Sequence, residues 1–330
     1  MIGHEDTSPI LLFQFGDPQI GLGTDHADRN GDTNRLLFAV NYINKTFSTH
    51  NKVMLMMGDQ VLWHSHGKTP CPPSELDGIK RGQDAWEGTV LCIPGNHDVW
   101  DPPTRSLFLS TYTLSRSYTS HDLGPSTTLI CLDTTSIDQK YKPADFPRED
   151  WDAEERHGEE QVEWLERELV RCEREGREVV VAGHYPLFLF DETEAASSYS
   201  LHPSKRAKLV NLLQTRSVHH YLAGHVHRTM HGVSTSGDLH CWIVAGTALA
   251  ADEDTMGYGV RAFEIHPCSA APSPPLLASL PHPLETFTSQ HSTVYTSWIK
   301  LDLPHEMVPP SCRELVEKHF SKLPERPGKE

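Results

Sequence analysis

Five short clusters of metal-binding side chains follow one another along this chain of 330 residues, each directly after a glycine. They are GDPQ with Asp17 and Gln19, GDQ with Asp59, GNHD with Asn96, His97 and Asp98, GHYP with His184, and GHVH with His225 and His227. Hard oxygens and imidazoles together can hold two divalent cations side by side. Such a pair is the minimum equipment for hydrolysing a phosphate ester through a metal-bound hydroxide.

The donor types suggest how two ions would be shared. Asp59 is our candidate for the ligand that touches both, because a carboxylate held at a strand end suits that role. Asp17, Gln19 and one histidine of GHVH would complete one site. Asn96, His184 and the other histidine would complete the second. On an extended segment, residues two apart point to the same side, so both GHVH histidines are expected to reach inward.

Two further features of the clusters bear on the chemistry. His97 and Asp98 follow the proposed ligand Asn96, so we expect His97 to donate a hydrogen bond or proton to the leaving oxygen while Asp98 holds its ring. The amide oxygen of Gln19 is a weaker donor than imidazole or carboxylate, which predicts a looser metal. The predicted cofactors are two divalent ions from among Mn²⁺, Fe²⁺, Mg²⁺ and Zn²⁺, with Mn²⁺ favoured.

The clusters need a scaffold, and the chain has the rhythm of alternating strands and helices. Six apolar runs have the length of buried strands: 10–15, 53–57, 90–93, 129–132, 179–182 and 220–223. Apolar spacings of three and four predict helices at 34–45 and 159–175, with a shorter one at 205–213. In an open α/β sheet, loops converge on a ligand at the carboxyl ends of the strands. Five of the six runs deliver a ligand type there.

The rest of the chain is interpreted from its composition. Segments 64–88 and 134–158 are polar and contain proline, which predicts loops over the active edge. Strands are expected at 242–245, 260–265 and 293–301, of which the last two can pair. The Pro/Ser-rich stretch 267–292 predicts a flexible hairpin insert, and 312–320 a short final helix. We expect one domain over residues 1–330.

Bulk properties exclude several classes of protein. The formal charge of −16 makes nucleic acid an unfavourable partner. The N-terminus has no basic region before its apolar run, and no segment approaches the roughly 20 apolar residues that span a bilayer, so neither a signal peptide nor a membrane partner is expected. Seven widely spaced cysteines without CxxC favour free thiols and a cytoplasmic location.

The five motifs in this order resemble the calcineurin-like metallophosphoesterase superfamily, over about residues 10–265. The resemblance implies an α/β fold, a four-layer αββα sandwich with the active site at the carboxyl ends of the strands. DPQ in place of the usual DxH, together with 186–189 and 199–209, looks like the cytosolic Ser/Thr phosphatases of the complete-S-transactivated type. Carried over by position, that family's metal ligands fall on Asp17, Gln19, Asp59, Asn96, His184, His225 and His227, with His97 catalytic. Leu62 stands where purple acid phosphatases require tyrosine, which argues against that group.

Three functions remain open from the sequence. The leading hypothesis is hydrolysis of phosphate monoesters, on a phosphoprotein or a small phosphate ester, by a metal-bridging hydroxide. An alternative is a Mn²⁺-dependent nucleotide or nucleoside-diphosphate-linked phosphohydrolase or phosphodiesterase, for which Trp63, Trp100 and Tyr185 are candidate base-stacking residues. The third is a non-catalytic metal-dependent scaffold, which would have no need of the His97–Asp98 pair.

Overall fold

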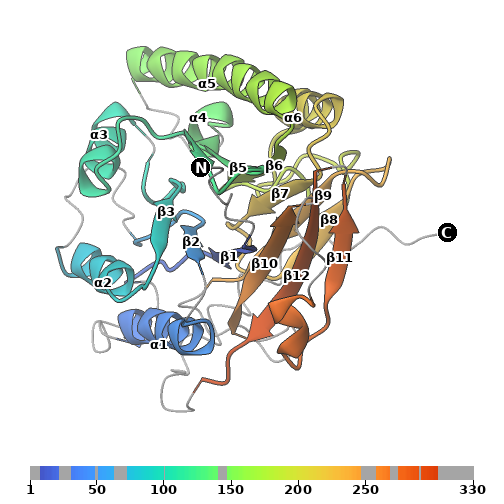
Figure 1. Ribbon diagram of the computed structural model, residues 1–330. Coiled ribbons are helices and arrows are strands. Elements are labelled where there is room, and N and C mark those ends of the chain that lie inside the picture. Colours follow the sequence, from blue (N-terminus) through green and yellow to red (C-terminus); the bar gives the residue numbers. More distant parts are fainter. Residues whose placement is uncertain are drawn as a thin grey trace, which may run out of the picture.

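Two six-stranded mixed sheets form the centre of the protein (Figure 1). The computed structural model describes residues 8–21, 31–48, 51–62, 73–99, 101–139, 147–246, 258–267, 274–289 and 291–303. The first sheet has the order β11 (Glu285–Thr288), β12 (Ser292–Lys300), β10 (Gly259–Pro267), β1 (Ile10–Phe15), β2 (Lys52–Met56) and β3 (Thr89–Cys92). The second has the order β4 (Thr119–Asp122), β5 (Thr127–Leu132), β6 (Glu178–Gly183), β7 (His220–Ala223), β9 (His240–Ile243) and β8 (Met230–Val233).

Helices cover the outer face of each sheet. Helices α1 (Gly31–Thr46) and α2 (Pro73–Asp84) pack against the first sheet, and α5 (Arg148–Glu175) and α6 (Pro203–Thr215) against the second. Two smaller helices, α3 (Pro102–Thr111) and α4 (Thr134–Ile137), lie near α5. A third apolar core fills the space between the sheets. Three cores between four layers make an αββα sandwich, so the predicted fold is confirmed.

Strand β1 shows how the sequence produces these layers. Side chains alternate across a strand, so Leu11, Phe13 and Phe15 face α1, while Ile10 and Leu12 face the second sheet. The exception is Gln14, which is fully buried between the sheets. Its Nε2 donates to the carbonyl oxygens of Ala223 (2.8 Å) and Trp242 (3.1 Å) and so ties the sheets together. The single polar residue in this strand is therefore a bridge between the layers.

The predicted elements agree well at the strands and less well at the helices. All six predicted βα strands are present within two residues of their expected ends, and β10 pairs with β12 as expected. Strands β4, β8 and β11 were not predicted. The helix expected at 159–175 begins at Arg148, so α4 and the first part of α5 lie in 134–158, where a loop was wrongly expected. Helix α2 lies in 64–88, also wrongly expected to be a loop, and α3 lies in a stretch for which no element was predicted. Helix α5 ends at Gly176 in a left-handed conformation, as the glycine predicted.

Helix α2 was not predicted, and it contains two glycines that allow it to pack closely. The segment was expected to be a loop because it is polar and contains proline, and its glycines also lower helix propensity. A Cβ on Gly78 would lie 2.4 Å from Oγ1 of Thr33, and one on Gly82 would lie 2.5 Å from Cδ2 of Leu36. Both glycines therefore allow α2 to approach α1 closely. Tertiary packing outweighs local propensity here.

The described part of the Pro/Ser-rich stretch is structured. It contains a short 3₁₀ turn, η2 (Leu276–Ser279), and the edge strand β11, which pairs with β12. Leu277 is fully buried, and its backbone N–H donates to Glu264 at 2.9 Å. The flexible insert was therefore an incorrect expectation for 274–289. The helix expected at 312–320 lies outside the described residues.

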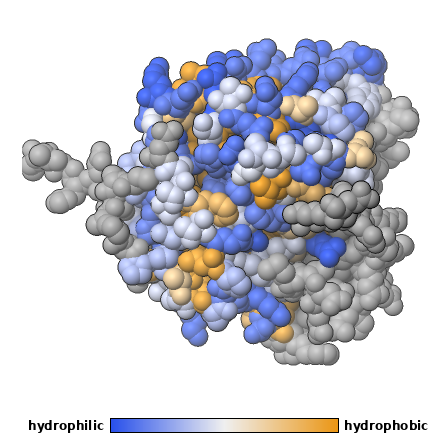
Figure 2. All heavy atoms as spheres, turned by 90° about the vertical axis from the view of Figure 1, so that its right-hand side faces the viewer, coloured by the Kyte–Doolittle hydropathy of each residue, from blue (hydrophilic) through white to orange (hydrophobic). Residues whose placement is uncertain are grey.

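The surface is polar where it can be seen. Figure 2, which looks onto the right-hand side of Figure 1, shows a largely hydrophilic face with hydrophobic residues in small, separate groups. None of the described helices has both the length and the apolar character that crossing a membrane requires.

Candidate metal centre

The five clusters meet at one edge of the sandwich. They directly follow β1, β2, β3, β6 and β7, so turns from both sheets contribute. The GDPQ and GDQ turns are joined by the backbone N–H of Gln19, which donates to the carbonyl oxygen of Asp59 at 2.8 Å. The two sheets are joined by the N–H of His225, which lies 3.0 and 2.9 Å from the carboxylate oxygens of Asp17. All nine predicted site residues belong to this one connected set.

Metal-ligand atoms converge there in two overlapping groups. One consists of Asp59, His184 and His225, and the other of Asp17, Asp59 and His227, each with its ligand atoms within 4.8 Å of one another. Asp59 is the member common to both. The sequence left open which GHVH histidine accompanies which site, and the structure places His227 with Asp17 and His225 with His184.

Backbone carbonyls fix how two of the histidines are oriented. Nδ1 of His184 lies 2.8 Å from the carbonyl oxygen of Met57, so this nitrogen carries the proton. Its Nε2 lies 3.1 Å from Oδ1 of Asn96 and 3.3 Å from Oδ2 of Asp59. Two ligands at right angles on an ion with bonds of about 2.1 Å are separated by about 3 Å. Both oxygens therefore lie at the distance from Nε2 that ligands of one cation would have.

His225 is held in the same way from another loop. Its Nε2 lies 3.1 Å from the carbonyl oxygen of Ser198, which can only accept, so Nε2 is protonated and Nδ1 is the acceptor nitrogen of the ring. The ring also packs edge-on against Tyr185, with centroids 4.8 Å apart. Outer contacts of this kind orient histidine ligands in metal sites.

The backbone at the site is in an unusual conformation. Of the seven non-glycine residues with positive φ in the described ranges, five belong to the site: Asp17, Gln19, Asp59, His225 and His227. Strained backbone of this kind concentrates at functional sites. The GHVH segment is therefore a turn, with φ of 69° and 55° at its histidines, and the extended geometry expected for it was wrong. Both histidines reach inward because of the turn.

Two glycines of the motifs make room for the carboxylates. A Cβ on Gly95 would lie 2.1 Å from Oδ1 of Asp59, and one on Gly224 would lie 2.5 Å from Oδ2 of Asp17. Any side chain at these positions would displace a carboxylate from the site. Gly95 and Gly224 are thus part of the site and more than turn formers.

The site concentrates buried negative charge. Burial raises the pKa of Asp17 well above its usual range, and burial followed by the neighbouring Asp59 raises the pKa of Asp98 to about 8. Burial also opposes ionisation of Asp59, but His184 and His97 hold its pKa well below its usual range. Against its own burial, the carboxylates of Asp59 and Asp17 raise the pKa of His184 to about 9.

Only histidines pair with Asp17 and Asp59 among the residues that the structure describes. No lysine or arginine there offsets their charge, which buried carboxylates need. Gln19 is 2 % exposed, and its Oε1 has no hydrogen-bond partner while its Nε2 lies 3.3 Å from Oδ2 of Asp59. The side-chain amide of glutamine can be turned so that either its nitrogen or its oxygen faces a site, and a bound cation would favour the oxygen. These residues fit a pair of divalent cations.

His97 and Asp98 have distinct surroundings. The carboxylate of Asp98 accepts the backbone N–H of Gln60 (3.0 Å) and of Gly95 (2.9 Å). It therefore joins the GDQ and GNHD turns, a role that the sequence did not indicate. The backbone N–H of His97 donates to Oδ1 of Asp59 at 2.8 Å, and its ring, 20 % exposed, has Nε2 3.8 Å from Oδ2 of Asp59. That ring lies at the mouth of the site.

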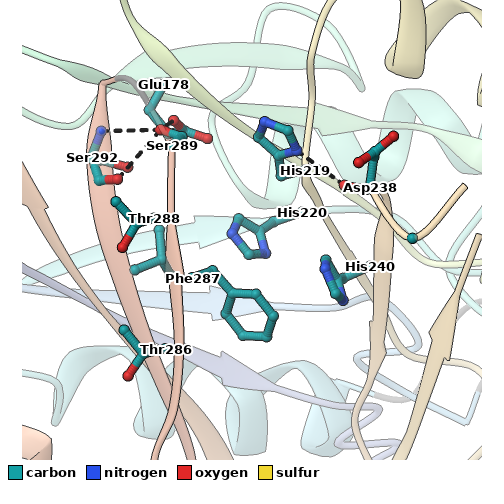
Figure 3. Close-up of a pocket in the computed structure, with 12 residues that line it drawn as sticks. Glu178, His219, His220, Asp238, His240, Thr286, Phe287, Thr288, Ser289 and Ser292 are labelled. Atoms are coloured by element: carbon teal, nitrogen blue, oxygen red, sulfur yellow. Dashed lines mark hydrogen bonds between the residues drawn. The ribbon is translucent and has the colours of Figure 1, made fainter.

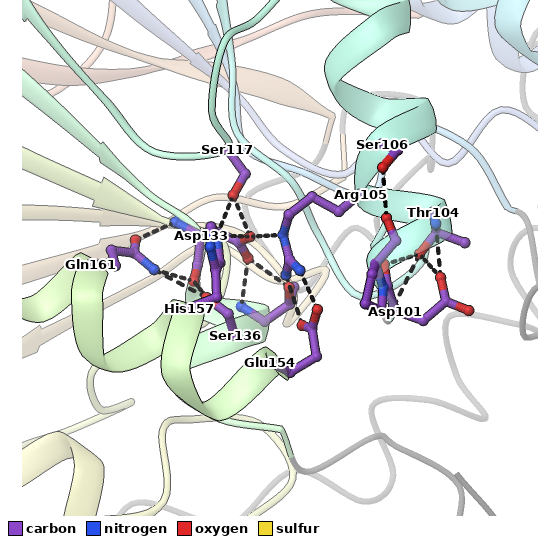
Figure 4. A network of polar contacts seen from close by, with 12 residues as sticks. Asp101, Thr104, Arg105, Ser106, Ser117, Asp133, Ser136, Glu154, His157 and Gln161 are labelled. Carbon is purple, nitrogen blue, oxygen red and sulfur yellow. Dashed lines mark hydrogen bonds and ion pairs between the residues drawn. The ribbon is translucent and has the colours of Figure 1, made fainter. Parts of the chain in front are cut away.

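A buried polar network next to this edge joins the end of β5 to α3 and α5 (Figure 4). Asp133, at the end of β5, receives Nε of Arg105 at 3.1 Å and the hydroxyl of Ser117 at 2.7 Å. Arg105 also donates to both carboxylate oxygens of Glu154 on α5. Arg105 lies on α3, which directly follows the GNHD turn, so the network fixes that turn relative to the second sheet. Asp133 thus has a structural role, whereas Asp17 and Asp59 at other strand ends belong to the converging ligand groups.

Comparison with solved structures shows the fold. A dimetal phosphatase from Danio rerio is 15 % identical, with a TM-score of 0.58, covering 78 % of this chain and 96 % of that one. GAP50, the anchor in the inner membrane complex of Plasmodium, is 13 % identical, with a TM-score of 0.53 and 96 % of each chain covered. A Staphylococcus aureus protein assigned as a 5′-nucleotidase is 13 % identical, with a TM-score of 0.50, covering 95 % of this chain and 58 % of that one. No curated protein matches the chain.

The family comparison covers the region that carries the five motifs. Residues 10–229 match the model of the family described as calcineurin-like phosphoesterase. This span is more than half of the chain and includes all nine site residues. The chain is therefore a metal-dependent phosphoesterase that belongs to the calcineurin-like phosphoesterase family.

Proposed function

We propose that this protein hydrolyses phosphate monoesters at a dinuclear metal centre. Its ligands are Asp17, Gln19, Asp59, Asn96, His184, His225 and His227. The observation that carries the proposal is that Asp59 belongs to both groups of converging ligand atoms. When bound, two divalent ions supply Lewis acidity to the phosphoryl oxygens and lower the pKa of water to about 7.

The protein residues divide the work of holding such a pair. Asp59 is the shared ligand, and the backbone N–H of His97 holds its Oδ1 in place. Asn96, His184 and His225 complete one site, whereas Asp17, Gln19 and His227 complete the other. The neutral amide of Gln19 reduces the charge of the second site, which supports the proposed preference for Mn²⁺.

His97 is the proposed proton donor to the leaving oxygen. Its ring lies beside Asp59 at the mouth of the site, with Nε2 3.8 Å from Oδ2 of Asp59. The carboxylate of Asp98 keeps the turn that carries His97 fixed to the GDQ turn. A general acid in this position contributes typically about 10²–10⁴-fold to the rate.

The proposed substrate is a phosphorylated serine or threonine side chain or a small phosphate ester. The resemblance of the DPQ motif and of 199–209 supports the protein substrate. A nucleotide substrate is the second candidate, and one of its three base-stacking candidates, Tyr185, is 1 % exposed and packed against His184 and His225. Trp63 and Trp100 lie outside the described residues. The four described cysteines are free thiols, which supports a cytoplasmic location.

A substrate panel in Mn²⁺ tests the proposal. p-Nitrophenyl phosphate and a phosphoserine peptide are compared with ADP-ribose and a cyclic nucleotide, using wild type and His97→Ala. We expect faster turnover of the monoesters and a fall of about 10²–10⁴-fold in kcat for His97→Ala at unchanged metal content. Faster turnover of ADP-ribose would favour the nucleotide alternative. Equal rates for both proteins would remove His97 from the mechanism, and no turnover with both ions bound would favour a scaffold.

A further inference from the structure

A separate pocket lies at the opposite end of the second sheet from the metal centre (Figure 3). Its volume is about 350 Å³. Glu178, His220 and His240, the first residues of β6, β7 and β9, line it, together with Phe287 of β11. The metal centre follows the last residues of β6 and β7, and at about 3.3 Å per residue His220 and His225 are on the order of 15 Å apart. The two sites are therefore distinct.

The pocket contains a buried carboxylate without a cation. Glu178 is 3 % exposed, and its Oε2 accepts the hydroxyl of Ser289. Within the described ranges no lysine, arginine or histidine forms an ion pair with it. A buried carboxylate that lacks a partner destabilises the fold unless something offsets the charge. Ser292 also lines the pocket, is fully buried, and its hydroxyl has no hydrogen-bond partner.

Uncharged ring faces form much of the wall. The ring of Phe287 lies 5.3 Å from that of His220 and 4.6 Å from that of His240, between centroids. Nε1 of Trp242 donates to Nδ1 of His220 at 3.2 Å, which requires an unprotonated nitrogen there. Burial lowers the pKa of His220 to about 3 and also lowers that of His240. At neutral pH these rings offer π faces and no positive charge.

The residues that line the pocket indicate which class of ligand it would bind. A second carboxylate, on the exposed residue Asp238, lines it, and no lysine or arginine does, so an anion would be repelled. In the described part of the chain, sets of three converging metal-ligand side chains occur only at the other edge. An organic cation satisfies both the charge and the ring faces.

We propose that this pocket binds a guanidinium group, with Glu178 as its ion-pair partner and Phe287 as its stacking surface. Guanidinium is favoured over ammonium because it is planar, stacks on rings and presents several donors in fixed directions. Those donors match the carboxylate of Glu178 and the unpaired hydroxyl oxygen of Ser292. The group belongs either to a free guanidino compound or to an arginine side chain of another protein.

Titration of the full chain with N-methylguanidinium, followed by calorimetry and by NMR of the aromatic rings, tests this site. Neutral N-methylurea, which has nearly the same shape, is the control ligand. We expect saturable binding of N-methylguanidinium only, weakened about tenfold or more in Glu178→Gln because a charge-assisted bond is lost. Glu163→Gln, an exposed glutamate of α5, is the matched control and should bind like wild type.

Phe287→Leu provides a second variant that keeps the charge and removes the stacking surface, and it should also bind more weakly. Hydrolysis of p-nitrophenyl phosphate is expected to be the same in all these variants, which shows that they are folded. A peptide containing arginine, compared with its citrulline equivalent and with arginine amide, distinguishes a protein-borne group from a free one. Absence of saturable binding, equal binding of N-methylurea, or wild-type affinity in Glu178→Gln would overturn the proposal.

Discussion

Nδ1 of His184 lies 2.8 Å from the carbonyl oxygen of Met57, the residue that links β2 to the GDQ turn. The strand that delivers Asp59 thus also sets the tautomer of a histidine from the other sheet. Because the carbonyl holds the proton on Nδ1, Nε2 faces Asn96 and Asp59. The two sheets cannot shift relative to each other without disturbing this arrangement, so the stability of the sandwich and the geometry of the site are coupled.

Gln19 is expected to set the affinity of one metal. We predict that Gln19→His binds Mn²⁺ more tightly, because imidazole is a better donor than an amide oxygen. Gln19→Leu removes the donor and should weaken one of two binding events by about tenfold or more. Calorimetric titration of metal-free protein with Mn²⁺ measures both. If Gln19→Leu binds two ions as tightly as wild type, Gln19 is not a ligand.

The network around Arg105 should contribute strongly to stability. Arg105→Met leaves the buried carboxylates of Asp133 and Glu154 without their cation, which is expected to cost about 3–5 kcal/mol of unfolding free energy. Arg148→Met, which removes an exposed ion pair with Asp152, should cost less than about 1 kcal/mol. Urea unfolding followed by tryptophan fluorescence compares the two. Similar midpoints for both variants would show that the network is dispensable.

Buried His220 should make stability depend on pH. Burial, with His240 as the next cause, lowers its pKa to about 3, whereas an unfolded histidine titrates near about 6.5. Between these pH values the folded state binds fewer protons than the unfolded state. The contribution of neutral His220 to stability is therefore complete above about pH 6.5 and is lost as pH falls towards 3. Wild type should lose up to about 1.4 kcal/mol per pH unit more than His220→Gln in this range.

Urea midpoints at pH 7.5, 6 and 5 measure that slope. His282→Gln, at a half-buried histidine, is the control and should keep the wild-type slope. Parallel pH profiles for wild type and His220→Gln would mean that His220 is not held neutral by the fold.

Much of this molecule could be predicted from its sequence, because strand ends and ligand types are local signals. The six βα strands and the meeting of nine site residues at one edge followed from apolar runs that end in motifs such as GDQ and GHVH. The pairing of His225 with His184, and of His227 with Asp17, could not be predicted. It depends on left-handed backbone in the GHVH turn, which side-chain spacing does not reveal.

The contacts that orient the site residues also could not be predicted from the sequence. The carbonyl oxygens of Met57 and Ser198 orient two histidines, but every residue has a carbonyl, so no residue type marks them. Arg105 on α3 contacts Asp133 at the end of β5, 28 positions away, and Glu154 on α5, 49 positions away, and tertiary packing alone brings them together. Charged residues in a polar stretch are expected to be exposed, but the packing of distant elements buries these residues.

We propose that one edge of the sandwich holds two divalent ions that share Asp59. Metal content per chain, measured by mass spectrometry after loading with Mn²⁺, tests it in wild type, in Asp59→Asn and in the control Asp84→Asn, an exposed aspartate of α2. We expect two ions in wild type and in Asp84→Asn, with a marked loss of both in Asp59→Asn. Two ions retained by Asp59→Asn at wild-type affinity would contradict it.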